Sequence, residues 1–207
     1  MLRSAAVLLL VGSLVAAAQA GKFNPKLSLG DTAPEWKDLP GVDGRQHSLA
    51  DLADKEVVVV VFTCNSCPYA VDYEDRLIAF AEQHTGPRSK VAVVAINVNT
   101  VEEDKFPQMQ ARAEEKGFDF PYLYDESQKI AKAYGANYTP EFFVLNKARK
   151  IVYMGAFDDN SDMDQVKTKY VEPAVAATLS GAKIEIAETA AVGCAVRYVS
   201  ERRKKKK

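Results

Sequence analysis

Two cysteines separated by two residues carry the clearest chemical signal in the sequence. The motif Cys64-Asn65-Ser66-Cys67 follows the apolar run Val57–Phe62 after a single residue and opens a segment with helical periodicity. A thiolate is the species that attacks a disulfide, and the free N–H groups and dipole at a helix N-terminus stabilise such an anion. We therefore predict thiol–disulfide exchange in which Cys64, at the start of the helix, is the nucleophile and Cys67 closes an intramolecular disulfide.

Two structural roles compete with this redox role for the cysteine pair. A zinc site would need two more ligands, and the chain offers only Cys194, His47 and His84, with no second paired motif. No metal is therefore expected. An inert structural bridge is less favoured, because a junction between strand and helix is where a dithiol gains chemical activity.

The third cysteine, Cys194, lies in a segment of alternating apolar residues that includes Val192, Val196 and Tyr198. This pattern predicts a buried, inert thiol. The alternative is a third redox thiol that takes over the disulfide of Cys64 and Cys67, because the number of cysteines is odd in a chain expected to be exported.

The elements that must position these thiols follow from hydrophobic periodicity and from turn residues. Strands are expected at 56–62, 91–98 and 122–124, followed by a hairpin of 141–145 with 151–155. Helices are expected from about 64 to 84, from Pro107 to Gly117, at 127–134 and at 162–179, the last broken or kinked at Pro173. This alternation predicts an α/β fold in which helices flank a central mixed β-sheet.

The first 20 residues have the pattern of a secretory signal. Arg3 precedes an apolar run at 5–18, and Ala18-Gln19-Ala20 is a small-residue cleavage site. The run is too short to span a bilayer comfortably. We expect cleavage after Ala20, no stable membrane insertion afterwards, and a periplasmic or secreted protein made of one domain at 21–200 and a basic tail at 201–207.

The charge distribution argues against nucleic acid as a partner. Of the 27 basic residues, Arg3 and the six at 202–207 lie at the ends, which leaves 20 basic against 28 acidic residues in the body. Nucleic-acid-binding domains instead spread basic residues over a face. The tail itself is expected to be solvated.

Four motifs resemble one known family. They are Gly30-Asp31-Thr32-Ala33-Pro34, the segment 43–49 (DGRQHSL), the segment 62–69 (FTCNSCPY) and the segment 139–145 (TPEFFVL). They are similar to the alkyl-hydroperoxide-reductase/thiol-specific-antioxidant (AhpC/TSA, redoxin) branch of the thioredoxin superfamily, over about residues 28–199. Within that branch the chain resembles exported thioredoxin-like proteins with a Cys-Asn-x-Cys-Pro-Tyr site and a late Gly-Cys, here Gly193-Cys194.

The resemblance implies a thioredoxin-like fold, no bound cofactor, and protein thiols or disulfides, small thiols or a redox partner protein as reaction partners. It also implies a cis peptide bond between Thr139 and Pro140, facing the cysteine pair. The backbone before such a proline is then free to pair with a substrate strand. Thr139 and Pro140 are the expected substrate-binding residues.

Departures from the family pattern bear on two alternative functions. A thiol peroxidase acting through Cys64 is one alternative, although peroxiredoxins carry a hydroxyl three residues before the reactive cysteine and a proline seven before it, where this chain has Val61 and Val57. A copper-binding, chaperone-like module is the other. Thioredoxin-fold proteins that deliver metal use a Cys-x-x-x-Cys-Pro motif and a distant histidine, whereas this chain has one residue fewer between its cysteines and no histidine after His84.

The proton-accepting group for Cys67 and the direction of electron flow are less defined. Thioredoxins have an acid six residues before the first cysteine, where this chain has Val58. Glu141, next to Pro140, is a candidate acceptor by position, and a solvent-facing strand carboxylate is the competing interpretation. Neither Asn65 nor Ser66 is a cation that would hold a thiolate, which favours a reductant over an oxidant.

Overall fold

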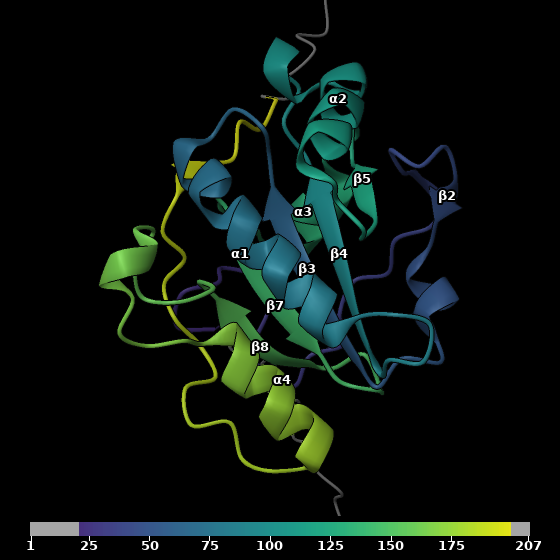
Figure 1. Cartoon of the computed structure of the whole chain (residues 1–207). Helices are drawn as coiled ribbons and strands as arrows, with labels where there is room; N and C mark the ends of the chain where they lie inside the picture. The colour runs from purple at the N-terminus through teal and green to yellow at the C-terminus, as the bar shows by residue number, and fades with distance from the viewer. Residues whose placement is uncertain (1–20, 200–207) are drawn as a thin grey trace, which may run out of the picture.

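The computed structural model describes residues 21–199; the expected signal at 1–20 and tail at 201–207 lie outside the described residues. Its centre is a five-stranded mixed sheet with the order β5-β4-β3-β7-β8 (Figure 1). Strands β3 (Val57–Thr63), β4 (Val91–Asn97) and β5 (Tyr122–Tyr124) are parallel to one another. Strands β7 (Glu141–Leu145) and β8 (Ile151–Gly155) form an antiparallel hairpin, and β7 pairs antiparallel with β3. The expected mixed sheet is confirmed.

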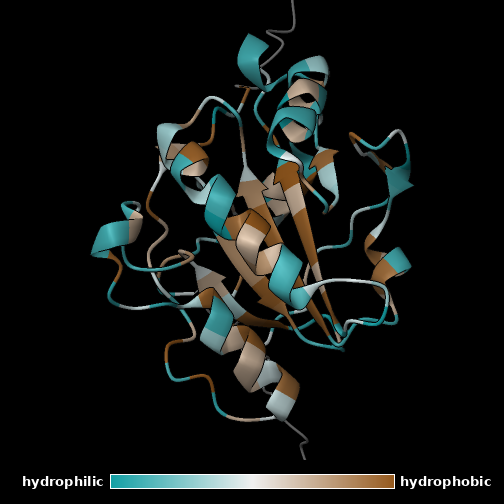
Figure 2. Cartoon of the chain, in the orientation of Figure 1, coloured by the Kyte–Doolittle hydropathy of each residue, from teal (hydrophilic) through white to brown (hydrophobic). Residues whose placement is uncertain are grey.

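Helices cover both faces of this sheet. Figure 1 shows α1 (Pro68–His84) and α4 (Val171–Ser180) in front of the sheet and α3 (Lys129–Tyr134) behind it, with α2 (Phe106–Lys116) above. Residues of β3 alternate between two buried clusters. One cluster faces α1, α2 and α4, and the other faces α3 and the segment before β3 that contains Ala33 and Trp36. Burial on both faces explains why β3 and β4 are almost entirely apolar, as their brown colour in Figure 2 shows.

Short elements complete the chain around this core. Two small antiparallel sheets of two strands each are formed by β1 (Leu39–Pro40) with β2 (Gln46–His47) and by β6 (Tyr138–Thr139) with β9 (Cys194–Ala195). Three 3₁₀ turns lie at Leu49–Leu52, Glu102–Asp104 and Met163–Gln165. Within 21–199, no helix is both long and apolar enough to cross a membrane.

Two helix predictions need correction, and proline explains both. The helix expected from about residue 64 begins at Pro68, because proline suits the first helical position and pushes the residue before it, Cys67, into an extended conformation. The helix expected at 162–179 is a 3₁₀ turn followed by α4, which starts only at Val171. Pro173 lies in the first turn of α4, where its missing N–H breaks no helical hydrogen bond.

Candidate functional site

The cysteine pair lies in the loop between the end of β3 and the start of α1. Both Cys64 and Cys67 are buried, each 2% exposed, and both are free thiols. Cys67 is the residue that immediately precedes the first turn of α1, with ψ of 118°. Therefore Cys67, and not Cys64 as expected, lies at the helix N-terminus.

Both sulfurs contact Thr139. The Sγ atom of Cys64 lies 3.4 Å from the hydroxyl oxygen of Thr139, and the thiol of Cys67 donates to the carbonyl oxygen of Thr139 at 3.0 Å. The peptide bond between Thr139 and Pro140 is cis, as the resemblance implies. Pro140 and Cys64 line the same small apolar hollow beside Tyr73. The structure thus brings together four of the expected site residues.

The surroundings of the two sulfurs shift their pKa values in opposite directions. A hydrogen bond from the Cys64 thiol lowers the pKa of Cys67 most, against the effect of burial, and the Cys194 thiol, the backbone N–H of Ala70 and the Thr139 hydroxyl add to the lowering. The same bond, together with burial and the nearby Asp104 carboxylate, raises the pKa of Cys64. The Thr139 carbonyl favours the protonated form of Cys67, but more groups donate to this sulfur than accept from it. In the dithiol form, the hydrogen bond between the two thiols therefore makes the first of their protons easier to lose and the second harder.

Asp104 organises the loop between the two cysteines. Its carboxylate is fully buried and accepts the backbone N–H of Asn65 at 2.7 Å, the backbone N–H of Ser66 at 2.8 Å and the Ser66 hydroxyl at 2.6 Å. Sequence reasoning missed this residue, because a run of three acidic residues such as 102–104 is typical of a solvated turn or helix start. One signal was present: parallel strands end at one edge of a sheet, so the segment after β4 lies beside the segment after β3.

The side chain of Asn65 locks the same loop from its other side. Its amide oxygen accepts the hydroxyl of Tyr122 at 2.9 Å, and its NH₂ group donates to the carbonyl of Glu103 at 3.0 Å. Asn65 therefore ties the cysteine loop to β5 and to the turn that carries Asp104.

Cys194 lies beside the pair instead of in a separate part of the core. It is half-buried, and its backbone N–H donates to the Sγ atom of Cys67 at 3.4 Å. Its strand β9 pairs antiparallel with β6, with Cys194 opposite Thr139. The resemblance implied that the backbone of Thr139 is free to pair with a substrate strand. The structure corrects this, because β9 already pairs with Thr139.

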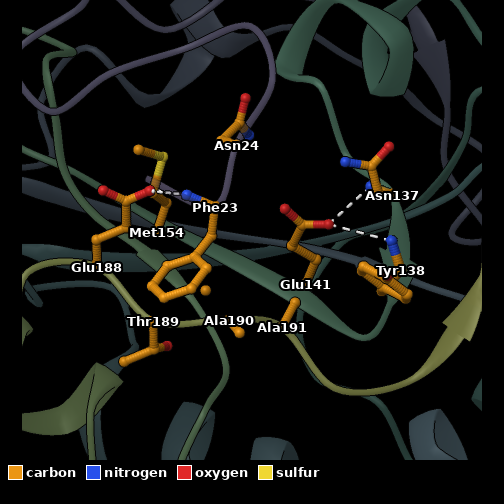
Figure 3. A pocket seen from close by; sticks show the side chains of 11 residues that line it. Phe23, Asn24, Asn137, Tyr138, Glu141, Met154, Glu188, Thr189, Ala190 and Ala191 are labelled. Atoms are coloured by element: carbon orange, nitrogen blue, oxygen red, sulfur yellow. Dashed lines mark hydrogen bonds between the residues drawn. The ribbon is translucent and has the colours of Figure 1, made fainter. Parts of the chain in front are cut away.

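Glu141 is buried, which corrects its interpretation as a solvent-facing carboxylate. One carboxylate oxygen accepts the backbone N–H groups of Asn137 and Tyr138 at 2.7 and 3.1 Å. The side chain lines a cavity of about 180 Å³. Figure 3 shows Phe23 and Glu188 among the other residues that line it. Burial raises the pKa of Glu141 to about 6. No cysteine lines this cavity, so the structure does not support Glu141 as the proton acceptor for Cys67.

The remaining sequence candidates lie away from the thiols or carry no hydroxyl. His47 bonds to Asp43 through its ring, and the ring of His84 packs against that of Phe80. Val57 and Val61 are fully buried in β3. Among residues 21–199, no group of three or more His, Cys, Asp or Glu side chains is placed to hold a metal ion.

Comparisons with known proteins identify the family. The model of the AhpC/TSA family matches residues 29–154. A Mycobacterium tuberculosis protein named "Putative peroxiredoxin" is 30% identical over 115 residues, which are 54% of this chain and 66% of that protein, slightly less than two thirds of its length.

Solved structures have the same overall fold. An uncharacterized conserved protein from Geobacillus kaustophilus is 33% identical with a TM-score of 0.79, over 86% of this chain and 96% of the other. A putative thioredoxin from Neisseria meningitidis, 21% identical with a TM-score of 0.57 over 72% of this chain and 92% of the other, shows the fold alone. With a family match over more than half of its length and this fold around its cysteines, the chain belongs to the AhpC/TSA family of thioredoxin-fold proteins.

Proposed function

We propose that the protein is a thiol–disulfide oxidoreductase in which Cys64 and Cys67 alternate between dithiol and disulfide, without a bound cofactor. The observation that carries this proposal is the contact of both sulfurs with Thr139, beside Pro140 and at the N-terminus of α1. This arrangement keeps two thiols close enough to interact and lowers the pKa of one of them.

Exchange with a partner disulfide begins at the sulfur that is deprotonated first. The lowered pKa of Cys67 supports this residue as the attacking thiolate, in place of Cys64. Cys67 then forms a mixed disulfide with one half of the partner and releases the other half as a thiol. Cys64 attacks Cys67, releases the bound half, and leaves the partner reduced and the pair oxidised.

The lowered pKa of Cys67 also bears on the direction of electron flow. A stabilised thiolate stabilises the dithiol form, which makes the corresponding disulfide more oxidising. The hydrogen bonds to Cys67 therefore favour an oxidant of partner proteins, whereas the uncharged Asn65-Ser66 pair alone favours a reductant.

Equilibration of the protein in glutathione buffers tests this proposal. The fraction of Cys64–Cys67 disulfide is measured after acid quenching, alkylation and peptide mapping. We expect one reversible two-electron transition, with a potential closer to about −120 mV than to about −270 mV. A value near −270 mV would assign the pair to reduction, and the absence of any reversible couple would refute the function.

The Cys194→Ser variant is the matched control, because it removes a thiol but keeps the pair. It is expected to retain the Cys64–Cys67 transition at an unchanged potential. Loss of this transition in Cys194→Ser would contradict a redox couple made of Cys64 and Cys67 alone.

A second candidate function is peroxide reduction. The relative from Mycobacterium tuberculosis carries the name peroxiredoxin, and two hydroxyls approach the Sγ atom of Cys64, from Thr139 at 3.4 Å and from Ser66 at 3.9 Å. Stoichiometric loss of hydrogen peroxide on mixing with the reduced protein would support it. If the rate of peroxide loss is that of a free thiol of the same pKa, this candidate fails.

We also propose that the chain is exported, on the basis of the signal-like residues 1–20. Its partners would then be thiols and disulfides of exported proteins. N-terminal sequencing of the protein recovered from cells tests this: a start at Gly21 supports export, and a start at Met1 contradicts it.

A further inference from the structure

The C-terminal segment 187–199, here called the strap, is built into the fold at both ends. At its beginning, Thr189 donates its N–H to the carbonyl of Met154 in β8, and its hydroxyl accepts the N–H of Ala156 at 3.0 Å. At its end, the Tyr198 hydroxyl donates to the carbonyl of Ala136 at 2.6 Å. In Figure 1 the strap is the yellow segment that passes β8 and reaches the start of α1.

Between these anchors, the strap approaches Thr139 closely. The pairing places Cys194 opposite Thr139, and a Cβ atom on Gly193 would lie 2.1 Å from the carbonyl oxygen of Thr139. Only glycine allows this approach. The strap therefore occupies the strand position beside the cis proline, and it presents a cysteine there.

The sulfur atoms have unequal surroundings. Cys194 packs against the cluster of Cys64, Cys67 and Ala70, and its N–H donates to Cys67. The pKa of Cys194 is raised to about 11 by burial and by the adjacent Cys67 thiol. Cys67 is thus the central sulfur, flanked by Cys64 on one side and by Cys194 on the other.

We propose that Cys194 is a third redox thiol whose exchange partner is Cys67, so that the disulfide moves from Cys64–Cys67 to Cys67–Cys194. The inference rests on the proposed thiol–disulfide function. Deprotonated Cys194 attacks the Sγ atom of Cys67, a Cys67–Cys194 bond forms, and the Cys64–Cys67 bond breaks. Cys64 leaves as a thiolate and takes up the proton that Cys194 lost, so no external oxidant or reductant is needed.

This exchange changes which thiol is free and where the disulfide lies. Cys64 and Cys67 are each 2% exposed, whereas Cys194 is half-buried on the strap. A disulfide on Cys194 is therefore more accessible to a partner thiol than one confined to the buried pair. The strap acts as an internal substrate strand that carries the disulfide outward.

Disulfide mapping of variants in which one of the three cysteines is replaced tests the exchange. Each variant of the full chain is oxidised with diamide, acid-quenched, alkylated and digested. Cys64→Ser is expected to form the Cys67–Cys194 disulfide in most molecules, and Cys67→Ser is expected to form little Cys64–Cys194 disulfide. If Cys64→Ser keeps two free thiols while the wild type forms Cys64–Cys67, the exchange is refuted but the proposed function stands.

A strap variant separates proximity from nonspecific oxidation. Gly193→Ala is expected to push the strap off Thr139 and to reduce the yield of Cys67–Cys194 severalfold in the Cys64→Ser background, with Val192→Ala, an exposed neighbour, as the matched control. An unchanged yield in Gly193→Ala would refute the role of the strap. If the wild type forms neither disulfide, the proposed function fails together with the exchange.

Discussion

The carboxylate of Asp104 holds Ser66 through two hydrogen bonds, one from its backbone N–H at 2.8 Å and one from its hydroxyl at 2.6 Å. A buried anion thereby lies against the two residues that separate the cysteines, and its charge adds to the hydrogen bond with Cys67 and to burial in raising the pKa of Cys64. Asp104 touches neither sulfur through a hydrogen bond, so it is a positioning residue for the cysteine loop.

Replacing Asp104 with asparagine keeps an oxygen acceptor but removes this charge. We expect the pKa of Cys64 in the reduced protein to fall toward its usual value, and alkylation of Cys64 at pH 9 to become faster. Because the amide cannot accept all three hydrogen bonds in the same way, the free energy of unfolding should also fall by about 1–3 kcal/mol. Site-resolved alkylation kinetics and urea unfolding measure the two effects.

Glu103→Gln is the control for the loss of one negative charge, because Glu103 is exposed and contributes only its backbone carbonyl to the site. It should leave both measurements near the wild-type values. Equal alkylation rates in Asp104→Asn and the wild type would contradict the effect of Asp104 on Cys64.

The pKa of Cys67 gives a second prediction, measured by thiolate absorbance at 240 nm in the reduced protein. We expect one thiolate to appear well below pH 9, and this early step to disappear in Cys67→Ser. In Cys64→Ala the step should move to higher pH, because the largest cause of the lowering is the hydrogen bond from Cys64.

The same shift affects the stability of the reduced protein. A lowered folded-state pKa contributes stability that is fully present above the unfolded-state value near 9 and is lost as pH falls through the folded-state value. Reduced wild-type protein should therefore gain stability relative to Cys67→Ser as the pH rises from 5 to 8.

One outcome of the absorbance titration would contradict both expectations. If the early titration step persists in Cys67→Ser and is lost in Cys64→Ala, Cys64 is the thiolate.

Glu141 provides a third prediction, with the opposite sign. Its pKa is raised to about 6, so its contribution to stability is present below the usual value near 4.5 and is lost as pH rises through 6. Between pH 4 and pH 7.5, wild-type protein should lose about 2 kcal/mol of unfolding free energy relative to Glu141→Gln. Urea unfolding of both proteins at each pH measures this difference.

A surface carboxylate serves as the comparison for this pH effect. Glu185 has an 80% exposed side chain, and Glu185→Gln should follow the wild-type pH profile. A wild-type profile parallel to that of Glu141→Gln would show that Glu141 ionises in the folded protein as it does in the unfolded chain.

The fold was predictable from local patterns, whereas the site was predictable only in part. The apolar strands β3 and β4 and the hairpin of β7 and β8 follow from runs of residues that must be buried. The contact of Ser66 with Asp104 joins residues 38 positions apart, and that of Cys67 with Cys194 joins residues 127 apart. No local pattern encodes such contacts, because they depend on where separate strands end in space.

The start of α1 was misplaced for a different reason. Helical periodicity continues backward from Tyr73 through the cysteine motif, but Pro68 sets the boundary through the conformation it imposes on Cys67. The helix therefore begins four residues later than expected, at Pro68, and Cys67 takes the place of Cys64 at its N-terminus.

A buried ion pair that ties α1 to the loop after β8 gives the last prediction. Asp158 is 3% exposed and accepts the guanidinium of Arg76 at 2.5 Å and the hydroxyl of Tyr73 at 2.9 Å. Asp158→Ala would leave Arg76 buried without its carboxylate, which should cost about 3–5 kcal/mol of unfolding free energy. Asp164→Ala, at an exposed site in the neighbouring 3₁₀ turn, is the matched control and should change stability little. Because Tyr73 and Arg76 lie on the helix that begins beside Cys67, Asp158→Ala should also loosen the cysteine loop and accelerate alkylation of the pair. An unchanged alkylation rate together with a measured loss of stability would show that this ion pair and the cysteine loop are uncoupled.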